Sequence, residues 1–249
     1  MKNISTNSMG TRLGKAREIY SQLTSFPDYA PDSEDLTLPK LKQFLDSVED
    51  QNSGTAVKIQ EYTSAVDARQ KSFLKDGGSM FQFALQMSSH VRYSFGRDSK
   101  EATAIHAMVI KIRGTGGRKK KNTAPTPVET AEPATTPDAP ATQSISRRER
   151  TYGNMTKVFT DIVATLASYN GTYKGTGAFS LEALKAKVFA YKELNDKAAK
   201  ANAVLIQTRD LRRELYKKLS VTMRRAKDAV SAQYSASSSQ YKIVKATKV

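Results

Sequence analysis

The chain has 249 residues, of which 39% are hydrophobic, and a formal net charge of +16 at pH 7. It has no cysteine, which excludes disulfides, thiolate zinc sites and cysteine nucleophiles, and no apolar run approaches the ~20 residues of a membrane helix. Because the N-terminal stretch also lacks the apolar core of a signal peptide, we expect a cytoplasmic protein without a membrane partner.

The first predicted helix covers residues 10–26, which have amphipathic spacing and end in the turn-rich stretch FPDYAPDSED. A longer helix follows, because apolar residues recur in steps of three and four from Leu38 to Phe73. This heptad stripe predicts a helix of roughly 38 residues, with Thr37 as its N-cap. The glycines of KDGGS then predict a bend before a helix of about 16 residues.

Two further signals end the first half of the chain, residues 1–113. Asp98 and Glu101 have the spacing of a capping box and predict the start of a last helix. Residues 114–150 are then rich in Pro, Thr and Ala, with almost no large apolar side chain. Because such a segment cannot offset its ordering entropy by burial, we expect a flexible linker bracketed by basic clusters.

The second half of the chain, residues 151–249, repeats the apolar pattern of the first. A shift of 143 residues superposes the stretch from about Leu13 to Lys75 on the second half without a gap. Matches cluster at apolar positions, as where Leu41 meets Leu184. We interpret the two halves as copies of one helical repeat.

Equivalent signals therefore predict equivalent helices in the second half. A short helix is expected over 152–169, a long helix with its N-cap at Ser180, and a capping box at Ser237-x-x-Gln240. The segment KKLS suggests a bend after the long helix. Since the shift drops to 139 beyond it, the second copy either has a shorter loop or continues as helix.

These patterns predict an all-α protein with a helical repeat over 1–113, the linker over 114–150 and a strongly basic helical repeat over 151–249. Each long helix has one apolar stripe that must be buried against another element. We expect the two tandem copies to pack as an elongated four-helix-type bundle with pseudo-two-fold symmetry. The linker is long enough for the copies to pack within one chain or to swap between chains.

Polar residues interrupt the apolar stripe at matched positions. Asn52 and Asn195 are predicted to fix the register, because only one alignment lets a buried amide find a partner. Arg69 and Arg212 on the same stripe would need carboxylate partners or an exposed end, since a lone buried charge is prohibitive. The alternative for all four residues is that the stripe faces solvent there.

The C-terminal segment carries short motifs of another kind. An Arg-rich turn leads to Leu215-Tyr216, and Tyr234-Ser235 and Ser238-x-x-Tyr241 follow. In these motifs the chain resembles an uncharacterised family of bacterial all-helical proteins with two tandem repeats. In the first repeat Phe95-Gly96 fits, but Ala102 stands where the family-like tyrosine would be. The resemblance covers about half of the chain and implies an all-helical fold and a bacterial origin, with no known activity.

Little in the sequence indicates catalysis, a metal or a cofactor. The two histidines, His90 and His106, lie on different predicted helices and have no partner at metal-ligand spacing. The glycines of 114–117 and of Gly175-x-Gly177 do not stand between a strand and a helix, as a phosphate loop would require. No GxSxG occurs. We therefore expect a protein that is not an enzyme, with no cofactor and no metal site.

The basic residues are the most informative feature for function. Residues 151–249 contain 18 Lys and Arg against 7 Asp and Glu, and eight of the basic residues lie between Arg209 and Lys227. At helical spacing they could follow a phosphate backbone, and the clusters at the linker ends could wrap a polyanion. The alternatives are a solvated helix face and a charged linker without a ligand. The candidate nucleic-acid-binding residues are Arg118, Lys119, Lys120, Lys121, Arg147, Arg148, Arg213, Lys217, Lys218, Arg224, Arg225 and Lys227.

Two functions are compatible with these patterns. The first is a non-enzymatic helical protein that binds DNA or RNA without sequence preference, in a packaging or accessory role. The second is a structural scaffold, in which the helical repeats pack as a homo-oligomer or in a larger complex and the positive charge meets acidic proteins.

Overall fold

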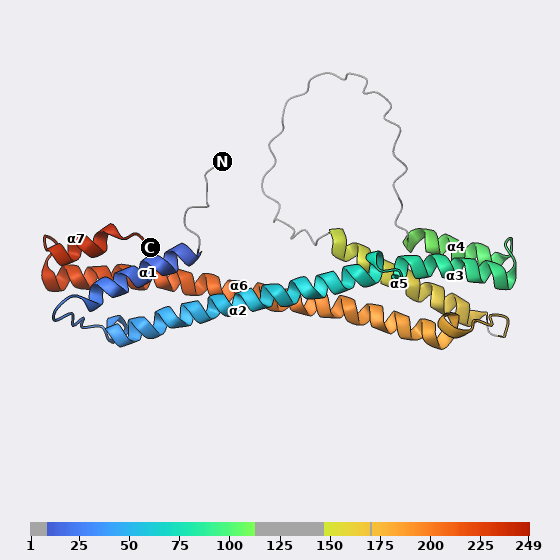
Figure 1. Ribbon diagram of the computed structural model, residues 1–249, viewed down its shortest axis with the longest axis horizontal. Helices are drawn as coiled ribbons and strands as arrows, with labels where there is room; N and C mark the ends of the chain where they lie inside the picture. Colours follow the sequence, from blue (N-terminus) through green and yellow to red (C-terminus); the bar gives the residue numbers. More distant parts are fainter. Residues whose placement is uncertain (1–8, 113–146, 170) are drawn as a thin grey trace, which may run out of the picture. The chain divides into compact units, whose positions relative to one another are not determined.

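The computed structural model describes residues 9–112, 147–169 and 171–249, which are helical apart from short connections and contain no strand. It divides into two compact units (Figure 1). Unit 1 consists of Met1–Ser64 and Lys200–Val249, and unit 2 of Ala65–Ala199. Each unit thus combines segments from both halves of the chain.

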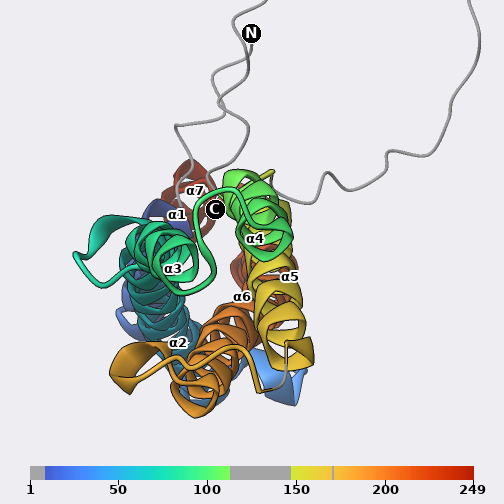
Figure 2. The same ribbon diagram turned by 90° about the vertical axis from the view of Figure 1, so that its right-hand side faces the viewer.

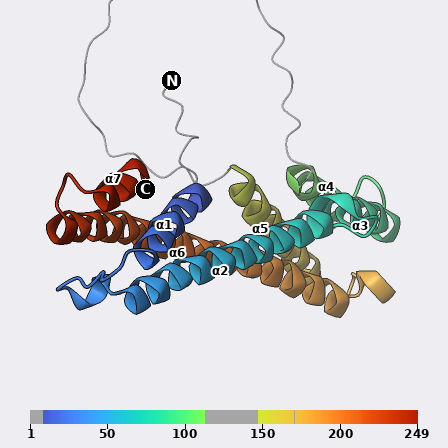
Figure 3. The same ribbon diagram turned by 60° about the vertical axis from the view of Figure 1, so that its left-hand side comes forward.

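Unit 1 contains α1 (Met9–Thr24), the short helix η2 (Glu34–Leu36), α7 (Ser239–Ala246) and parts of two long helices. These are the first part of α2 (Leu38–Gln70) and the last part of α6 (Leu181–Tyr234). Helix α7 contacts α1, and both accompany the last part of α6 (Figures 1 and 3). The residues buried in the core of unit 1 are Leu13, Ala16, Ile19, Leu23, Leu36, Leu41, Leu45, Val48, Tyr216, Leu219, Met223, Ala226, Val230 and Val244.

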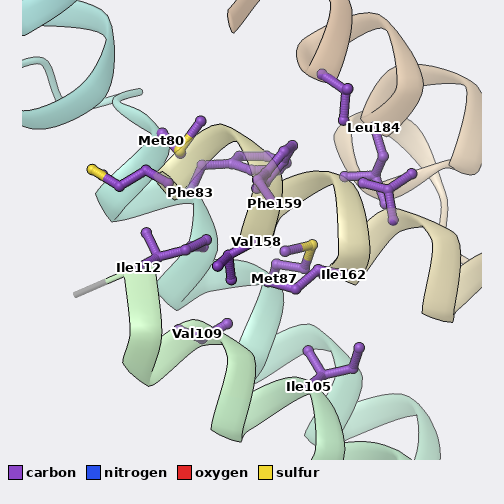
Figure 4. Packing of buried hydrophobic residues seen from close by; sticks show 14 of the residues in the cluster. Met80, Phe83, Met87, Ile105, Val109, Ile112, Val158, Phe159, Ile162 and Leu184 are labelled. Atoms are coloured by element: carbon purple, nitrogen blue, oxygen red, sulfur yellow. The ribbon is translucent and has the colours of Figure 1, made fainter. Parts of the chain in front are cut away.

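Unit 2 contains the end of α2, the π-helical turn η3 (Lys71–Lys75), α3 (Met80–Phe95) and α4 (Lys100–Ile112). The second half of the chain adds α5 (Arg147–Ser168), the short helix η4 (Gly177–Phe179) and the first part of α6. Helix α4 packs against both α3 and α5 (Figure 2). Figure 4 shows the core between them, where Val109 and Ile105 of α4 face side chains of α3 and α5.

The long helix of the first half agrees with its prediction. Helix α2 and η3 together run from Leu38 to Lys75, and the turn at Asp76-Gly77-Gly78 separates them from α3. The apolar residues spaced at three and four, such as Leu41 and Leu45, are buried. The heptad stripe is therefore the face that packs in the core.

The second long helix does not bend. Helix α6 continues for 54 residues from Leu181 to Tyr234, so the bend suggested by KKLS is wrong and the alternative of a continuous helix is confirmed. The physical reason lies in the residues at the bend. Gly77 and Gly78 of the first half align with Ser220 and Val221, which do not interrupt a helix as a glycine pair does.

The helix caps differ from the prediction by one residue at two places. The N-cap of α7 is Ser238, whose Oγ accepts from the backbone N–H of Tyr241 at 3.1 Å, rather than Ser237. Likewise Ser99, rather than Asp98, accepts from the N–H of Ala102 at 3.1 Å at the start of α4. Both predicted capping boxes are therefore wrong by one position.

The caps of the long helices also differ from each other. Ser180 is confirmed as an N-cap, since its Oγ accepts from the N–H of Ala183 at 3.2 Å. The hydroxyl of Thr37 instead donates to the carbonyl of Glu34 at 2.8 Å. Thr37 therefore closes η2 rather than capping α2 with its side chain.

The fold class is confirmed as all-α over the described residues. The division of the chain at 113 and 150 concerns the order of repeats along the sequence and stays a prediction. The compact units follow a different division, because each takes helices from both halves of the chain.

Candidate nucleic-acid interface

The predicted basic residues from Arg213 to Lys227 all lie on the last part of α6, in unit 1. This part of the helix turns Tyr216, Leu219 and Met223 into the core. The basic side chains occupy the rest of its circumference, and five of the six predicted residues are exposed, whereas Lys227 is half-buried. Their interactions divide them into three groups.

Arg213 and Lys217 form ion pairs along the helix itself. The Nη1 of Arg213 lies 2.8 Å from Oδ1 of Asp210, and Nζ of Lys217 lies 2.7 Å from Oε1 of Glu214. The hydrogen bond from Lys217 lowers the pKa of Glu214. Because exposed pairs of this kind are worth only about 0.3–0.5 kcal/mol, a phosphate group can replace the carboxylate.

Arg225 and Lys227 have structural partners in unit 1. The guanidinium of Arg225 binds the carboxylate of Asp35 and donates to Oγ of Ser33 at 3.1 Å, which ties α6 to the segment before α2. The Nζ of Lys227 donates to the carbonyl of Thr247, and partial burial lowers the pKa of this amine. We therefore remove Lys227 from the candidate interface and regard Arg225 as part of the fold.

Lys218 and Arg224 are exposed, and neither forms an ion pair within the described part of the chain. Arg209, which the sequence-based selection missed, is exposed and unpaired in the same sense. The signal that would have found it is its spacing, because Arg209, Arg213 and Lys217 stand four residues apart on one helix face.

The remaining predicted basic residues cannot be placed in the interface. Arg118, Lys119, Lys120 and Lys121 lie outside the described residues. Arg147 and Arg148 begin α5, where the structure describes the backbone alone.

The two half-buried asparagines each have a hydrogen-bond partner within their own unit. The Nδ2 of Asn52 donates to the hydroxyl of Tyr216 at 2.8 Å, and that of Asn195 donates to the hydroxyl of Thr156 at 2.9 Å. Each Oδ1 is buried without a hydrogen bond in the described part of the chain. The role of Tyr216 and Thr156 as acceptors was missed, although both are buried hydroxyl residues.

Within the described residues, the arginines on the same stripe form no ion pair with a carboxylate. Arg69 is 5% exposed, and its guanidinium carbon lies 4.6 Å from the centre of the Tyr152 ring. The Nε atoms of Arg69 and Arg212 are buried without a hydrogen bond among the described residues. A cation–π contact therefore takes the place of the predicted salt bridge at Arg69. The alternative that the stripe faces solvent at the four polar residues is wrong for Arg69, which is buried, whereas Asn52, Asn195 and Arg212 are half-buried.

The two histidines and Gly175, which were considered for metal or phosphate binding, have structural roles instead. His106 shares a hydrogen bond of 3.2 Å with Ser88, and His90 stacks on Phe179 with ring centres 4.6 Å apart. Within the described residues no group of three or more potential ligands could hold a metal ion. A Cβ at Gly175 would lie 2.1 Å from the carbonyl oxygen of Phe179, so this glycine permits a close approach in the loop before α6.

Comparisons with known proteins add no assignment. No protein-family model matches the chain, and neither a curated protein nor a solved structure is significantly similar to it. Over the described part of the chain, no helix combines the length and the hydropathy that a membrane span requires.

Proposed function

We propose that the protein binds nucleic acid without sequence preference, through the exposed basic residues of α6 in unit 1. The observation that carries the proposal is that Arg209, Lys218 and Arg224 are exposed and form no ion pair within the described residues. Such side chains are free to bind phosphates, and each contact releases a counterion from the nucleic acid.

The neighbouring basic residues extend this surface. Arg213 and Lys217 exchange their exposed carboxylate partners for phosphates at little cost. The segment from Ala229 to Val249 contains Lys242, Lys245 and Lys248 and no acidic residue. The clusters at Arg118–Lys121 and Arg147–Arg150 stay candidate contacts of the nucleic acid that are predicted from the sequence alone. A packaging or accessory role in the cytoplasm of a bacterium follows from this mode of binding and from the family resemblance.

We regard the fold that presents this surface as a duplicated helical repeat with pseudo-two-fold symmetry. Burial supports the duplication, because matched positions are buried together: Ile19 with Ile162 and Leu41 with Leu184 are all fully buried. Phe73 and Tyr216, which are also matched, are 0% and 1% exposed. An ancestral pair of identical repeats explains this agreement.

The test is the salt dependence of binding. Fluorescence anisotropy of labelled duplex DNA and of labelled single-stranded RNA is measured against the full chain from 50 to 200 mM salt. If about five phosphates are neutralised, the slope of log affinity against log salt is about −4.5 for duplex DNA. Absence of binding to both probes at 50 mM salt would contradict the proposal.

A second function, that of an assembly scaffold, is favoured by one observation. Ile206, Leu211 and Val221 on the same part of α6 are 49%, 62% and 54% exposed. Exposed apolar residues of this size gather at protein interfaces. Light scattering that shows only a monomer, together with salt-sensitive binding of nucleic acid, would favour the first function over this one.

A further inference from the structure

The two units differ in what holds the halves of the chain together. In unit 1, side-chain hydrogen bonds and an ion pair join the first half to the second. They connect Arg12 to Ser220, Gln51 to Thr208, Asn52 to Tyr216, Asp35 to Arg225, Asp28 to Gln233, and Glu18 to Thr247.

In unit 2 the halves meet through rings. Phe73 packs edge-on against Tyr152 and Tyr191, with ring centres 5.2 Å apart in both cases, and Phe83 stacks on Phe179 at 5.2 Å. Among the described residues of unit 2, no side-chain hydrogen bond or ion pair joins the two halves. Cation–π contacts of Arg69 with Tyr152 and of Lys187 with Phe83 also join the halves. Ring contacts of this kind are less selective for a partner than the side-chain hydrogen bonds of unit 1.

The half-buried asparagines of the two units also differ in which half of the chain supplies their hydrogen-bond acceptor. Asn195 takes its acceptor, Thr156, from its own half of the chain. Asn52 takes its acceptor, Tyr216, from the other half. At the shift of 143, Thr156 aligns with Leu13 and Tyr216 aligns with Phe73. The first half therefore has neither hydroxyl at the matched positions and cannot satisfy Asn52 by pairing with a copy of itself.

Charge disfavours the pairing of two second halves. In unit 1, residues 9–64 carry 6 basic and 9 acidic residues, whereas residues 200–249 carry 12 basic and 3 acidic residues. Pairing the first half with the second is electrostatically favourable. Pairing two second halves would bring two strongly positive segments together.

We propose that unit 1 selects the partner: the first half of the chain pairs with a second half, in the same chain or in a second copy, and not with another first half. Any dimer formed through these helices is then a reciprocal exchange of halves. The tested contact joins half-buried Asn52 to buried Tyr216, and neither is a proposed phosphate-binding residue, so this contact can be examined separately from nucleic-acid binding by α6.

The hydrogen bond to Asn52 is tested in the full chain by chemical denaturation. Tyr216→Phe removes the acceptor and is expected to raise the unfolding equilibrium constant about tenfold. Tyr241→Phe is the matched control, because Tyr241 is half-buried against the same core and its hydroxyl forms no hydrogen bond among the described residues. Equal effects of the two substitutions would overturn the proposal.

A second pair of variants transfers the acceptor. Leu13→Thr gives the first half the hydroxyl that Thr156 provides in the second. We expect Leu13→Thr to be destabilising alone but to restore much of the loss in the Tyr216→Phe background. Strict additivity of the two substitutions would show that Asn52 does not depend on a hydroxyl partner.

Partner choice is tested by cross-linking, which the absence of cysteine makes simple. The full chain with Gln51→Cys and Thr208→Cys is treated with a short bis-maleimide and is expected to cross-link, because Gln51 Nε2 lies 3.2 Å from the carbonyl oxygen of Thr208. The chain with Gln51→Cys alone is expected to give no covalent dimer. A symmetric dimer from this single variant, at the yield of the double variant, would overturn the proposal.

Discussion

At the scale of single residues, Gly175 shows how a glycine without φ strain can still be indispensable. A Cβ there would lie 2.1 Å from the carbonyl oxygen of Phe179 and 2.6 Å from the hydroxyl of Tyr173. Such distances do not occur in folded proteins, so the loop must move to accept a side chain. The pair Gly175-x-Gly177 is thereby explained by packing rather than by phosphate binding.

We predict opposite effects of alanine at two glycines of unit 2. Gly175→Ala is expected to lower the free energy of unfolding by about 1–3 kcal/mol, because the loop is overpacked. Gly153→Ala is expected to raise it by up to about 1 kcal/mol, because Gly153 lies in α5 and a Cβ there meets nothing within 4 Å. Urea denaturation of both variants checks this, and a stabilising Gly175→Ala would contradict the geometry.

The buried polar residues mark the limit of prediction at this scale. The heptad position of Asn52 and Asn195 suffices to predict that they interrupt an apolar stripe. Their acceptors, Tyr216 and Thr156, could not be predicted, because an apolar stripe on one helix does not reveal which other helix packs against it. The same reason explains why Arg69 was expected to need a carboxylate and instead lies over Tyr152.

At the scale of helices, periodicity predicts the elements well and their ends less well. The apolar stripes that begin at Leu38 and Leu181 both lie on long helices, α2 and α6. The continuation of α6 depended on two residues, Ser220 and Val221, in place of a glycine pair. The caps were displaced by one residue, because adjacent serines such as Ser237 and Ser238 satisfy the same sequence pattern.

The cap of α7 leads to a prediction with a matched control. Ser238→Ala removes the acceptor for the N–H of Tyr241 and is expected to destabilise α7 by about 1 kcal/mol. Ser237→Ala removes a hydroxyl whose one hydrogen bond among the described residues is with Ser235, and it is expected to have a smaller effect. Amide hydrogen exchange of α7 is measured in both variants. Faster exchange in Ser237→Ala than in Ser238→Ala would contradict Ser238 as the N-cap and support the capping box predicted at Ser237.

At the scale of the whole molecule, the sequence predicts an all-α protein but not its division into compact units. The two halves have equivalent apolar stripes, so periodicity cannot say which helices meet. The division depends on long-range contacts, such as that of Asn52 with Tyr216 in unit 1. The basic residues were predictable as a group. The sequence does not predict which of these residues lack an ion-pair partner, because such partners can be distant along the chain: Asp35, the partner of Arg225, is 190 residues away.

The proposed function depends on this last distinction, since only unpaired basic residues are free to bind phosphates at no cost to the fold. Lys218 and Arg224 are such residues. Lys40 and Lys71 are the matched control, because both are exposed, form no ion pair among the described residues and belong to α2 and η3 rather than to α6. Reversing either pair to Glu changes the net charge by the same amount.

The most direct measurement is the affinity of these two variants for labelled duplex DNA, determined by anisotropy at several salt concentrations. Lys218→Glu with Arg224→Glu is expected to weaken binding at least about tenfold and to reduce the salt slope by about 2, the loss of two phosphate contacts. Lys40→Glu with Lys71→Glu is expected to change the affinity much less and to leave the slope unaltered. Equal losses in the two variants would contradict the account, because binding would then depend on net charge and not on this face of α6.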